Sequence, residues 1–181
     1  MNHYALGILL PQEIKKSIFS IQSGIPNITW LNLEDLFFPI QFFGVLSAED
    51  RLDLISLLDT FSFPLLNLKL AKIKVSINKH NSGFIYSELE PSCLPHLQKL
   101  AKDLKEHIKT LNLSYSKERK EFQTLIGSFK NTNPEFLSYY LESKNNFLTP
   151  SWQTNLYSFL ETPLNSFRIS IEKKFINNLN P

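Results

Sequence analysis

The stretch LFFPIQFFG at residues 36–44 poses the main question of this sequence. Seven of its nine residues are apolar or aromatic, as in a strand that is buried on both faces. Pro39 stands in the middle, where proline removes a hydrogen bond between strands and where central strands normally exclude it. The stretch therefore predicts a strand with an irregular point at Pro39.

The composition predicts one soluble domain. A chain of 181 residues is long enough for one substantial core, and no apolar run is long enough for a membrane span. The net charge of +2 is too small to indicate nucleic-acid binding through bulk charge, so an anionic ligand must be held locally. The start has no signal-peptide pattern, and the single Cys93 excludes an intramolecular disulfide. We therefore expect a soluble cytoplasmic protein that does not associate with a membrane.

Strands and helices are expected to alternate along the chain. Apolar periodicity and turn residues indicate helices after Pro11, after a capping box that begins at Ser47, over residues 94–111, and after Asn133. Strands are expected over residues 3–10, 36–43, 68–77, 83–90, 121–130, 152–160 and 166–175.

Two of these strands show further detail. The apolar phase flips between Leu70 and Ile73, as one inserted residue at a bulge would produce. The apolar residues of the last strand alternate cleanly through Phe167, Ile169 and Ile171, which is typical of a strand.

The order of elements predicts an α+β fold made of two similar β-α-β-α-β halves in a single domain over residues 1–181. The first half covers about residues 1–80 plus the terminal strand, and the second about residues 83–165. The strands at 36–43 and 122–129 take equivalent places, so we expect them to line a two-sided cleft between two lobes, with helices on the outside.

The chain resembles the two-histidine phosphoesterases, which include bacterial 2'-5' RNA ligases (LigT-like proteins) and RNA 2',3'-cyclic phosphodiesterases. The resemblance begins with the strand that ends at Leu10-Pro11 and continues through Trp30, residues 36–44, the middle hairpin and the long helix. It closes around Leu156-Tyr157 and the terminal strand. It covers nearly the whole chain, and its specificity comes from the order and spacing of these segments.

All four motif positions of that family are occupied by other residues here. The family carries His-x-Thr, or His-x-Ser, on each of two equivalent strands. The first histidine and threonine fall on Phe37 and Pro39, and the second pair falls on Leu125 and Gly127. Two opposed imidazoles can act as general base and general acid on a phosphodiester, while the hydroxyls hold the phosphate oxygens. Phenylalanine, proline, leucine and glycine can do neither.

Four other residues are candidate ligand-binding groups. The resemblance implies that His3 stands where an arginine often lies near the cleft, and that Gln41 and Lys130 follow the two motifs at positions of family arginines. Tyr157 matches a common family tyrosine. The alternative interpretation makes Lys130 an ordinary lysine at a strand end and Tyr157 a core residue. Among the remaining candidates, His80, His96 and His107 are expected at the surface, and Cys93 lacks an evident histidine base.

The resemblance therefore implies a pseudoenzyme without the family's catalysis, with a nucleotide, an RNA end or a protein partner as ligand. The sequence shows no metal-binding pattern and implies no cofactor. The alternative is an active phosphodiesterase of 2',3'-cyclic phosphates with a rearranged site, for example His3 with Tyr157 or Lys130. A third possibility is that Phe37, Pro39 and Leu125 fill the cleft as additional core. The sequence does not indicate an oligomeric state.

Overall fold

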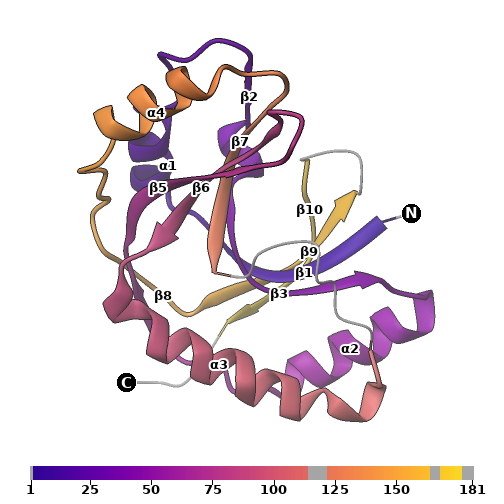
Figure 1. Cartoon of the computed structure of the whole chain (residues 1–181). Coiled ribbons are helices and arrows are strands. Elements are labelled where there is room, and N and C mark those ends of the chain that lie inside the picture. Colours follow the sequence, from indigo (N-terminus) through magenta and orange to yellow (C-terminus); the bar gives the residue numbers. More distant parts are fainter. Residues whose placement is uncertain (1, 114–121, 164–167, 177–181) are drawn as a thin grey trace.

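The computed structural model of the chain describes residues 2–113, 122–163 and 168–176. Within these residues, two four-stranded antiparallel sheets and one two-stranded sheet are accompanied by four α-helices (Figure 1). The fold is mixed α and β, so the fold class expected from the sequence is confirmed. No helix in the described ranges combines the length and the apolar character that crossing a membrane requires.

Sheet A has the strand order β10-β9-β1-β3. Its strands come from both ends of the chain and from the stretch at residues 36–44. They are β1 (Asn2–Leu9), β3 (Phe37–Val45), β9 (Leu156–Pro163) and β10 (Ser170–Ile176). One side of this sheet is covered by α2 (Ala48–Thr60) and α3 (Leu94–His107), which lie along its lower side in Figure 1.

Sheet B has the strand order β2-β7-β6-β5. It contains β2 (Ile28–Trp30), β5 (Leu70–Ile77), β6 (Gly83–Leu89) and β7 (Gln123–Phe129), and it is accompanied by α1 (Gln12–Phe19) and α4 (Pro134–Ser143) (Figure 1). The short strands β4 (Leu66–Leu68) and β8 (Trp152–Thr154) form the third sheet.

The helices bury their apolar stripes as the sequence periodicity indicates. In α3 the residues at three- and four-residue steps are buried, and α2 buries Leu54 and Leu58. Of the predicted capping box the N-cap bond is present, since the Ser47 hydroxyl accepts the backbone N–H of Asp50 at 3.0 Å. The long helix is shorter than predicted: α3 ends at His107 and is followed by a 3-10 turn over Lys109–Leu111.

The predicted bulge in β5 is confirmed. The register against β6 shifts between Ala71 and Ile73, and the intervening Lys72 has a φ of 57°. The expected strand over residues 152–160 is split into β8 and β9.

The apolar alternation of the last strand does not mark its buried side chain. Ile171 is 45% exposed, and Phe175 is the buried residue of β10. Phe167 lies outside the described residues. A bulge between Ile171 and Lys173 shifts the register against β9, so the apolar alternation seen in the sequence does not continue through the strand.

Candidate functional site

Pro39 is tolerated because β3 is the edge strand of sheet A. It is paired on one side with β1, where Gly7 lies opposite Pro39 and Leu6 lies opposite Gln41. Ile40 is therefore the extra residue of a bulge next to the proline. Edge strands and bulges are the places in a sheet where a missing backbone N–H costs little.

The first motif lies on a face of sheet A that we call face A, defined by His3, Ala5, Gly7 and Leu9 of β1 with Phe37 and Pro39 of β3. Residues directly opposite one another in an antiparallel pair share a face, and Phe37 and Pro39 are opposite Leu9 and Gly7. The two motif positions therefore point to the same side, as the family pattern requires.

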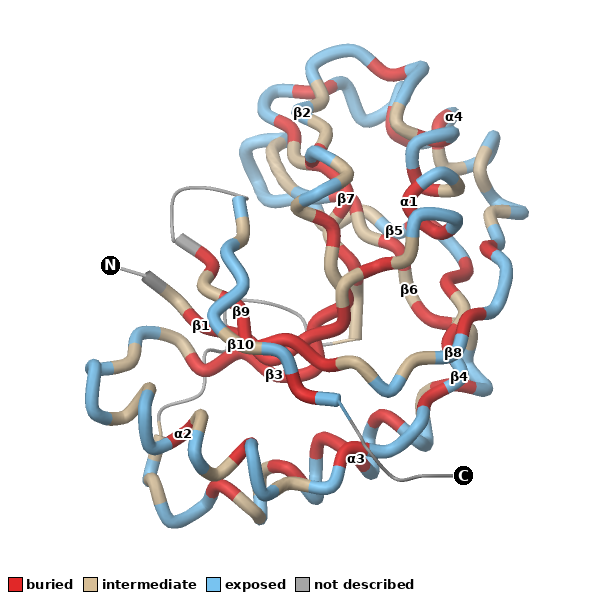
Figure 2. The backbone as a smooth tube through the Cα atoms, turned by 180° about the vertical axis from the view of Figure 1, so that it is seen from behind, coloured by how far each residue is buried: buried red, intermediate tan, exposed pale blue. Residues whose placement is uncertain are grey.

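Face A is filled by apolar side chains around the motif. A Cβ added at Gly7 would lie 2.7 Å from Cδ2 of Phe37, so the aromatic ring covers the glycine. The Phe37 ring also meets the Phe42 ring edge to face, with centroids 6.3 Å apart. Figure 2 shows the central parts of β1 and β3 as buried. The first motif position thus contributes packing where the family has an imidazole.

The second motif lies on β7, and its two positions point to opposite faces of sheet B. Leu125 is opposite Tyr86 of β6, whereas Gly127 is opposite Ile85, and Ile126 is the extra residue of a bulge between them. Tyr86 is half-buried, while Ile85 is fully buried on the other side of its strand. A histidine and a threonine placed at 125 and 127 would therefore not converge on one phosphate.

Trp30 occupies the space beside Gly127. The two residues are opposite one another in β2 and β7, and a Cβ at Gly127 would lie 2.8 Å from Cε3 of Trp30. The indole also packs against the Tyr140 ring of α4, with centroids 6.0 Å apart. Position 127 has no room for a hydroxyl-bearing side chain in this arrangement.

A backbone hydrogen bond links the segments of the two motif strands. The backbone N–H of Phe122, the residue before β7, donates to the carbonyl oxygen of Pro39 at 3.1 Å. Phe122 has a φ of 61°, a region that bulky residues rarely adopt. The strands at 36–43 and 122–129 therefore lie beside one another at this point.

The polar group beside Gly7 is the hydroxyl of Ser158 on β9. Ser158 is fully buried, and its Oγ has no hydrogen-bond partner within the described part of the chain. A hydroxyl that solvent cannot reach offers no contact to a ligand in this conformation.

His3 and Gln41 lie apart from the motif positions. His3 is half-buried on face A, but it is four residues before Gly7, which is about 13 Å along a strand. Gln41 is 0% exposed and is opposite the buried Leu6, and its side-chain amide donates to the carbonyl of Phe42 at 3.1 Å. The burial of Gln41 leaves it no surface for a phosphate.

Tyr157 is a core residue. It is fully buried, its ring stacks on Phe63 with centroids 4.4 Å apart, and its hydroxyl donates to the carbonyl of Pro64 at 2.6 Å. Burial raises the pKa of Tyr157 above its ordinary value, because the charged phenolate is poorly solvated there. A buried phenol held by a backbone carbonyl is a structural group.

Lys130 is exposed and follows β7 directly. It lies five residues beyond Leu125, at the end of the sheet where Phe129 pairs with Gly83 and Ile28. The structure therefore does not form one ligand site from His3, Gln41, Lys130 and Tyr157.

The sequence analysis missed a set of partly exposed side chains on the other motif sheet. We define face B as Lys74 of β5, Phe84, Tyr86 and Glu88 of β6, and Leu125 of β7. Lys74 and Leu125 are both opposite Tyr86, and Phe84 and Glu88 are two residues from Tyr86 along the strand. The residues of face B on β6 alternate with the buried Ile85, Ser87 and Leu89, and this alternation is the sequence signal that could have predicted the face.

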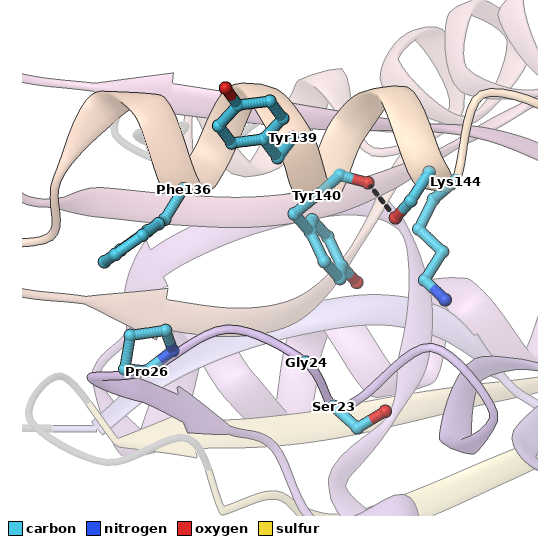
Figure 3. Close-up of a pocket in the computed structure, with 8 residues that line it drawn as sticks. Ser23, Gly24, Pro26, Phe136, Tyr139, Tyr140 and Lys144 are labelled. Atoms are coloured by element: carbon cyan, nitrogen blue, oxygen red, sulfur yellow. Dashed lines mark hydrogen bonds between the residues drawn. The ribbon is translucent and has the colours of Figure 1, made fainter.

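A shallow pocket of about 400 Å³ lies elsewhere, between α4 and the loop after α1 (Figure 3). Tyr139, Phe136, Pro26 and Lys144 are among its lining residues, and Tyr139 is 70% exposed. The pocket contains none of the predicted site residues. Within the described ranges, no three His, Cys, Asp or Glu side chains gather closely enough to hold a metal ion.

Solved structures with a similar fold include LigT of Escherichia coli and a protein described as a phosphoesterase. The TT0787 protein of Thermus thermophilus matches with a TM-score of 0.72 and 10% identity, over 98% of this chain and 100% of that one. LigT of Escherichia coli in complex with 3'-AMP matches with a TM-score of 0.67 and 14% identity, over 98% of each chain. The same protein in complex with ATP matches with a TM-score of 0.62 and 14% identity, over 97% of each chain.

The chain therefore has the LigT fold, and the resemblance found in the sequence is confirmed at the level of the fold. Identities of this size show the fold alone. No protein-family model and no curated protein sequence matches the chain.

Proposed function

We propose that this protein is a LigT-fold protein that binds a nucleotide or an RNA end without cleaving it. The observation that carries this proposal is the occupation of the motif positions. Phe37 and Pro39 make face A apolar, Leu125 adds an apolar side chain to face B, and Gly127 lies under Trp30 on the opposite side of β7. General acid–base catalysis needs a titratable group within hydrogen-bond reach of the reacting phosphate, and none of these residues supplies one.

The ligand class is proposed from the fold neighbours. LigT has been solved with 3'-AMP, with NADP+, with ATP and with phosphate. A nucleotide is therefore the first ligand to test on this chain. The single buried Cys93 is consistent with the cytoplasmic location that forms part of this proposal.

A rearranged catalytic site receives no support from the geometry. His3 lies about 13 Å along β1 from Gly7, Tyr157 donates its hydroxyl inside the core, and Lys130 stands at the end of sheet B. A base and an acid must reach one phosphate from two sides, and these three residues belong to separate regions.

The test has two parts. Purified protein is incubated with a 2',3'-cyclic nucleotide without added metal, beside the His3→Ala variant, and we expect no hydrolysis above the buffer rate in either. The thermal midpoint of the wild-type protein is then measured with and without 3'-AMP. We expect 3'-AMP to raise this midpoint, because a ligand that binds only the native state stabilises it. Hydrolysis by the wild-type protein that is lost in His3→Ala would overturn the non-catalytic assignment. An unchanged midpoint at millimolar 3'-AMP would overturn the nucleotide assignment.

A further inference from the structure

We propose that the groove between α4 and the loop over residues 20–27 docks an extended segment of a partner protein that carries proline and an acidic side chain about four residues apart. This groove is the shallow pocket of about 400 Å³ in Figure 3, and we call it the α4 groove. It is a second site, apart from both motif positions, so the inference goes beyond the proposed function and does not depend on nucleotide binding.

One face of α4 forms the first wall of the α4 groove. Phe136, Tyr140 and Lys144 follow one another at four-residue steps along the helix and its C-cap, so their side chains share a face. Figure 3 shows all three side chains directed toward the loop over residues 20–27. Phe136 is 48% exposed, whereas Tyr140 is 4% exposed. The wall therefore has an open aromatic ring at one end, a buried ring in the middle and an amine at the other end.

The facing loop is held in place by bonds to its neighbours. The hydroxyl of Tyr140 donates to the carbonyl of Ile21 at 2.7 Å, and its ring packs on Trp30. The side-chain amide of Gln22 donates to the carbonyl of Leu31 at 3.0 Å. The two walls are therefore fixed relative to one another before a ligand arrives, which lowers the entropic cost of binding.

Lys144 gives the α4 groove its charge preference. It is half-buried, and it is the one charged residue among the described residues that line the groove. Within the described part of the chain its amine forms no ion pair and no hydrogen bond. The facing loop over residues 20–27 contains no charged residue that could neutralise it. A partner with a carboxylate at this end is therefore complementary to the groove.

The rest of the α4 groove fits proline and an open backbone. Pro26 is exposed and lies across from Phe136 in Figure 3, so the two rings form an apolar end of the kind that takes proline. The hydroxyl of Ser23 and the backbone N–H of Gly24 have no hydrogen-bond partner among the residues described. A proline-containing extended chain has no internal hydrogen bonds, so its carbonyls are available to these donors.

The length of the α4 groove sets the spacing of the two groups. Lys144 is eight residues after Phe136, which is about 12 Å along a helix axis. An extended chain with the rise of polyproline II covers this distance in about four residues. A shallow groove of this length suits a peptide, because small-molecule sites enclose most of the surface of their ligand.

The experiment measures the binding of fluorescein-labelled twelve-residue peptides by anisotropy. Each peptide contains one Pro-Pro pair, one glutamate placed one to seven residues before or after the pair, and serine or alanine elsewhere. We expect the strongest binding at a separation of about four residues in one of the two orders. Phe136→Ala should weaken the binding of that peptide about 5-fold or more, as for a central aromatic contact.

A charge exchange tests the role of Lys144. Lys144→Gln should weaken the binding of the glutamate peptide and should leave the binding of the same peptide with glutamine unchanged. Lys144→Glu should reverse the preference, so that a peptide with lysine in place of glutamate binds better than the original. A merely structural role of Lys144 would not produce this reversal.

Matched controls remove similar side chains outside the α4 groove. Leu52 of α2 is 60% exposed, and Lys102 of α3 is exposed. Leu52→Ala and Lys102→Gln should leave peptide binding unchanged. The thermal midpoints of the Phe136 and Lys144 variants should stay near that of the wild type, because both residues are partly exposed.

Three results would overturn the inference. They are binding of no peptide above the level of a serine–alanine peptide, equal binding by the wild type and Phe136→Ala, and a dimer in analytical ultracentrifugation that Phe136→Ala abolishes, which would assign the groove to a second copy of the chain. The shift in thermal midpoint with 3'-AMP should be the same in Phe136→Ala and the wild type. The peptide site and the proposed function can therefore fail independently.

Discussion

The backbone N–H of Phe122 lies 3.1 Å from the carbonyl oxygen of Pro39, and this bond joins the two motif strands. Pro39 lacks an N–H of its own, but its carbonyl still accepts. The start of β7 is thus tied to the middle of β3 through backbone atoms, independently of which side chains occupy the motif positions. The same strand arrangement can therefore persist when the catalytic residues are absent.

Gly127→Ala should destabilise the protein by about 1–3 kcal/mol, the usual cost of overpacking a filled site. Its Cβ would lie 2.8 Å from the Trp30 ring, which is itself packed on Tyr140. The measurement is urea unfolding, with Ser128→Ala as the neighbouring control on the half-buried side of β7. Equal stability of Gly127→Ala and wild type would show that the indole moves aside at no cost.

Gly83→Ala should prevent the β5–β6 hairpin from closing as it does here. A Cβ at Gly83 would overlap the carbonyl oxygen of Ser76, a backbone atom that cannot move without breaking the hairpin. We expect the thermal midpoint to fall strongly, or the protein to be insoluble. Gly24→Ala is the control: it has a φ of 86° but no neighbouring atom within 4 Å, so its cost should be about 1 kcal/mol. Similar midpoints for the two variants would contradict this explanation.

Stability should fall at alkaline pH because two phenols are buried. Burial raises the pKa of Tyr140 from 10.0 to about 12, and raises that of Tyr157 as well. A pKa that is higher in the folded state than in the unfolded state gives stability that is complete below about pH 10 and is lost as the pH rises toward the folded pKa. Denaturant titrations between about pH 9 and pH 12 should show this decline.

The same titrations with Tyr140→Phe and Tyr157→Phe test the cause. Each variant should show a weaker decline above about pH 10. Each should also be less stable at neutral pH by about 1–3 kcal/mol, because the carbonyls of Ile21 and Pro64 lose buried donors. An unchanged alkaline slope in both variants would assign the decline to other groups.

Ser47→Ala should cost about 1 kcal/mol, because the Ser47 hydroxyl accepts the N–H of Asp50 at the start of α2. Ser56→Ala in the same helix is the control. Ser56 is exposed in the helix interior, where alanine is the better helix former, so this variant should be neutral or slightly stabilising. Urea unfolding of the two variants compares them directly, and equal losses would rule out capping as the cause.

Local patterns in the sequence predicted most of the fold. The Ser47 cap and the three- and four-residue steps of α3 follow from interactions within a few residues, so they can be recognised without tertiary information. The bulge near Lys72 was visible in the sequence as a flip in the apolar phase. The alternation in the last strand was misleading, because the register of β10 against β9 decides which side chains are buried.

The candidate site was predicted less well than the fold. A match of positions 125 and 127 to a His-x-Thr motif assumes regular alternation, and the bulge at Ile126 breaks it through pairing with a distant strand. The burial of Gln41 and Tyr157 likewise depends on neighbours that come from other parts of the chain. The rings of face B were visible only as an alternation in β6, which predicts a strand but does not predict what that face contacts.

The contact between Trp30 and Gly127 also constrains the order in which this sequence can change. A threonine at position 127 is incompatible with the indole at position 30, so the smaller side chain must appear at 30 before the larger one can appear at 127. Even then, the extra residue at Ile126 would have to be lost before positions 125 and 127 shared a face. No single substitution in this chain therefore produces a paired His-x-Thr arrangement on β7.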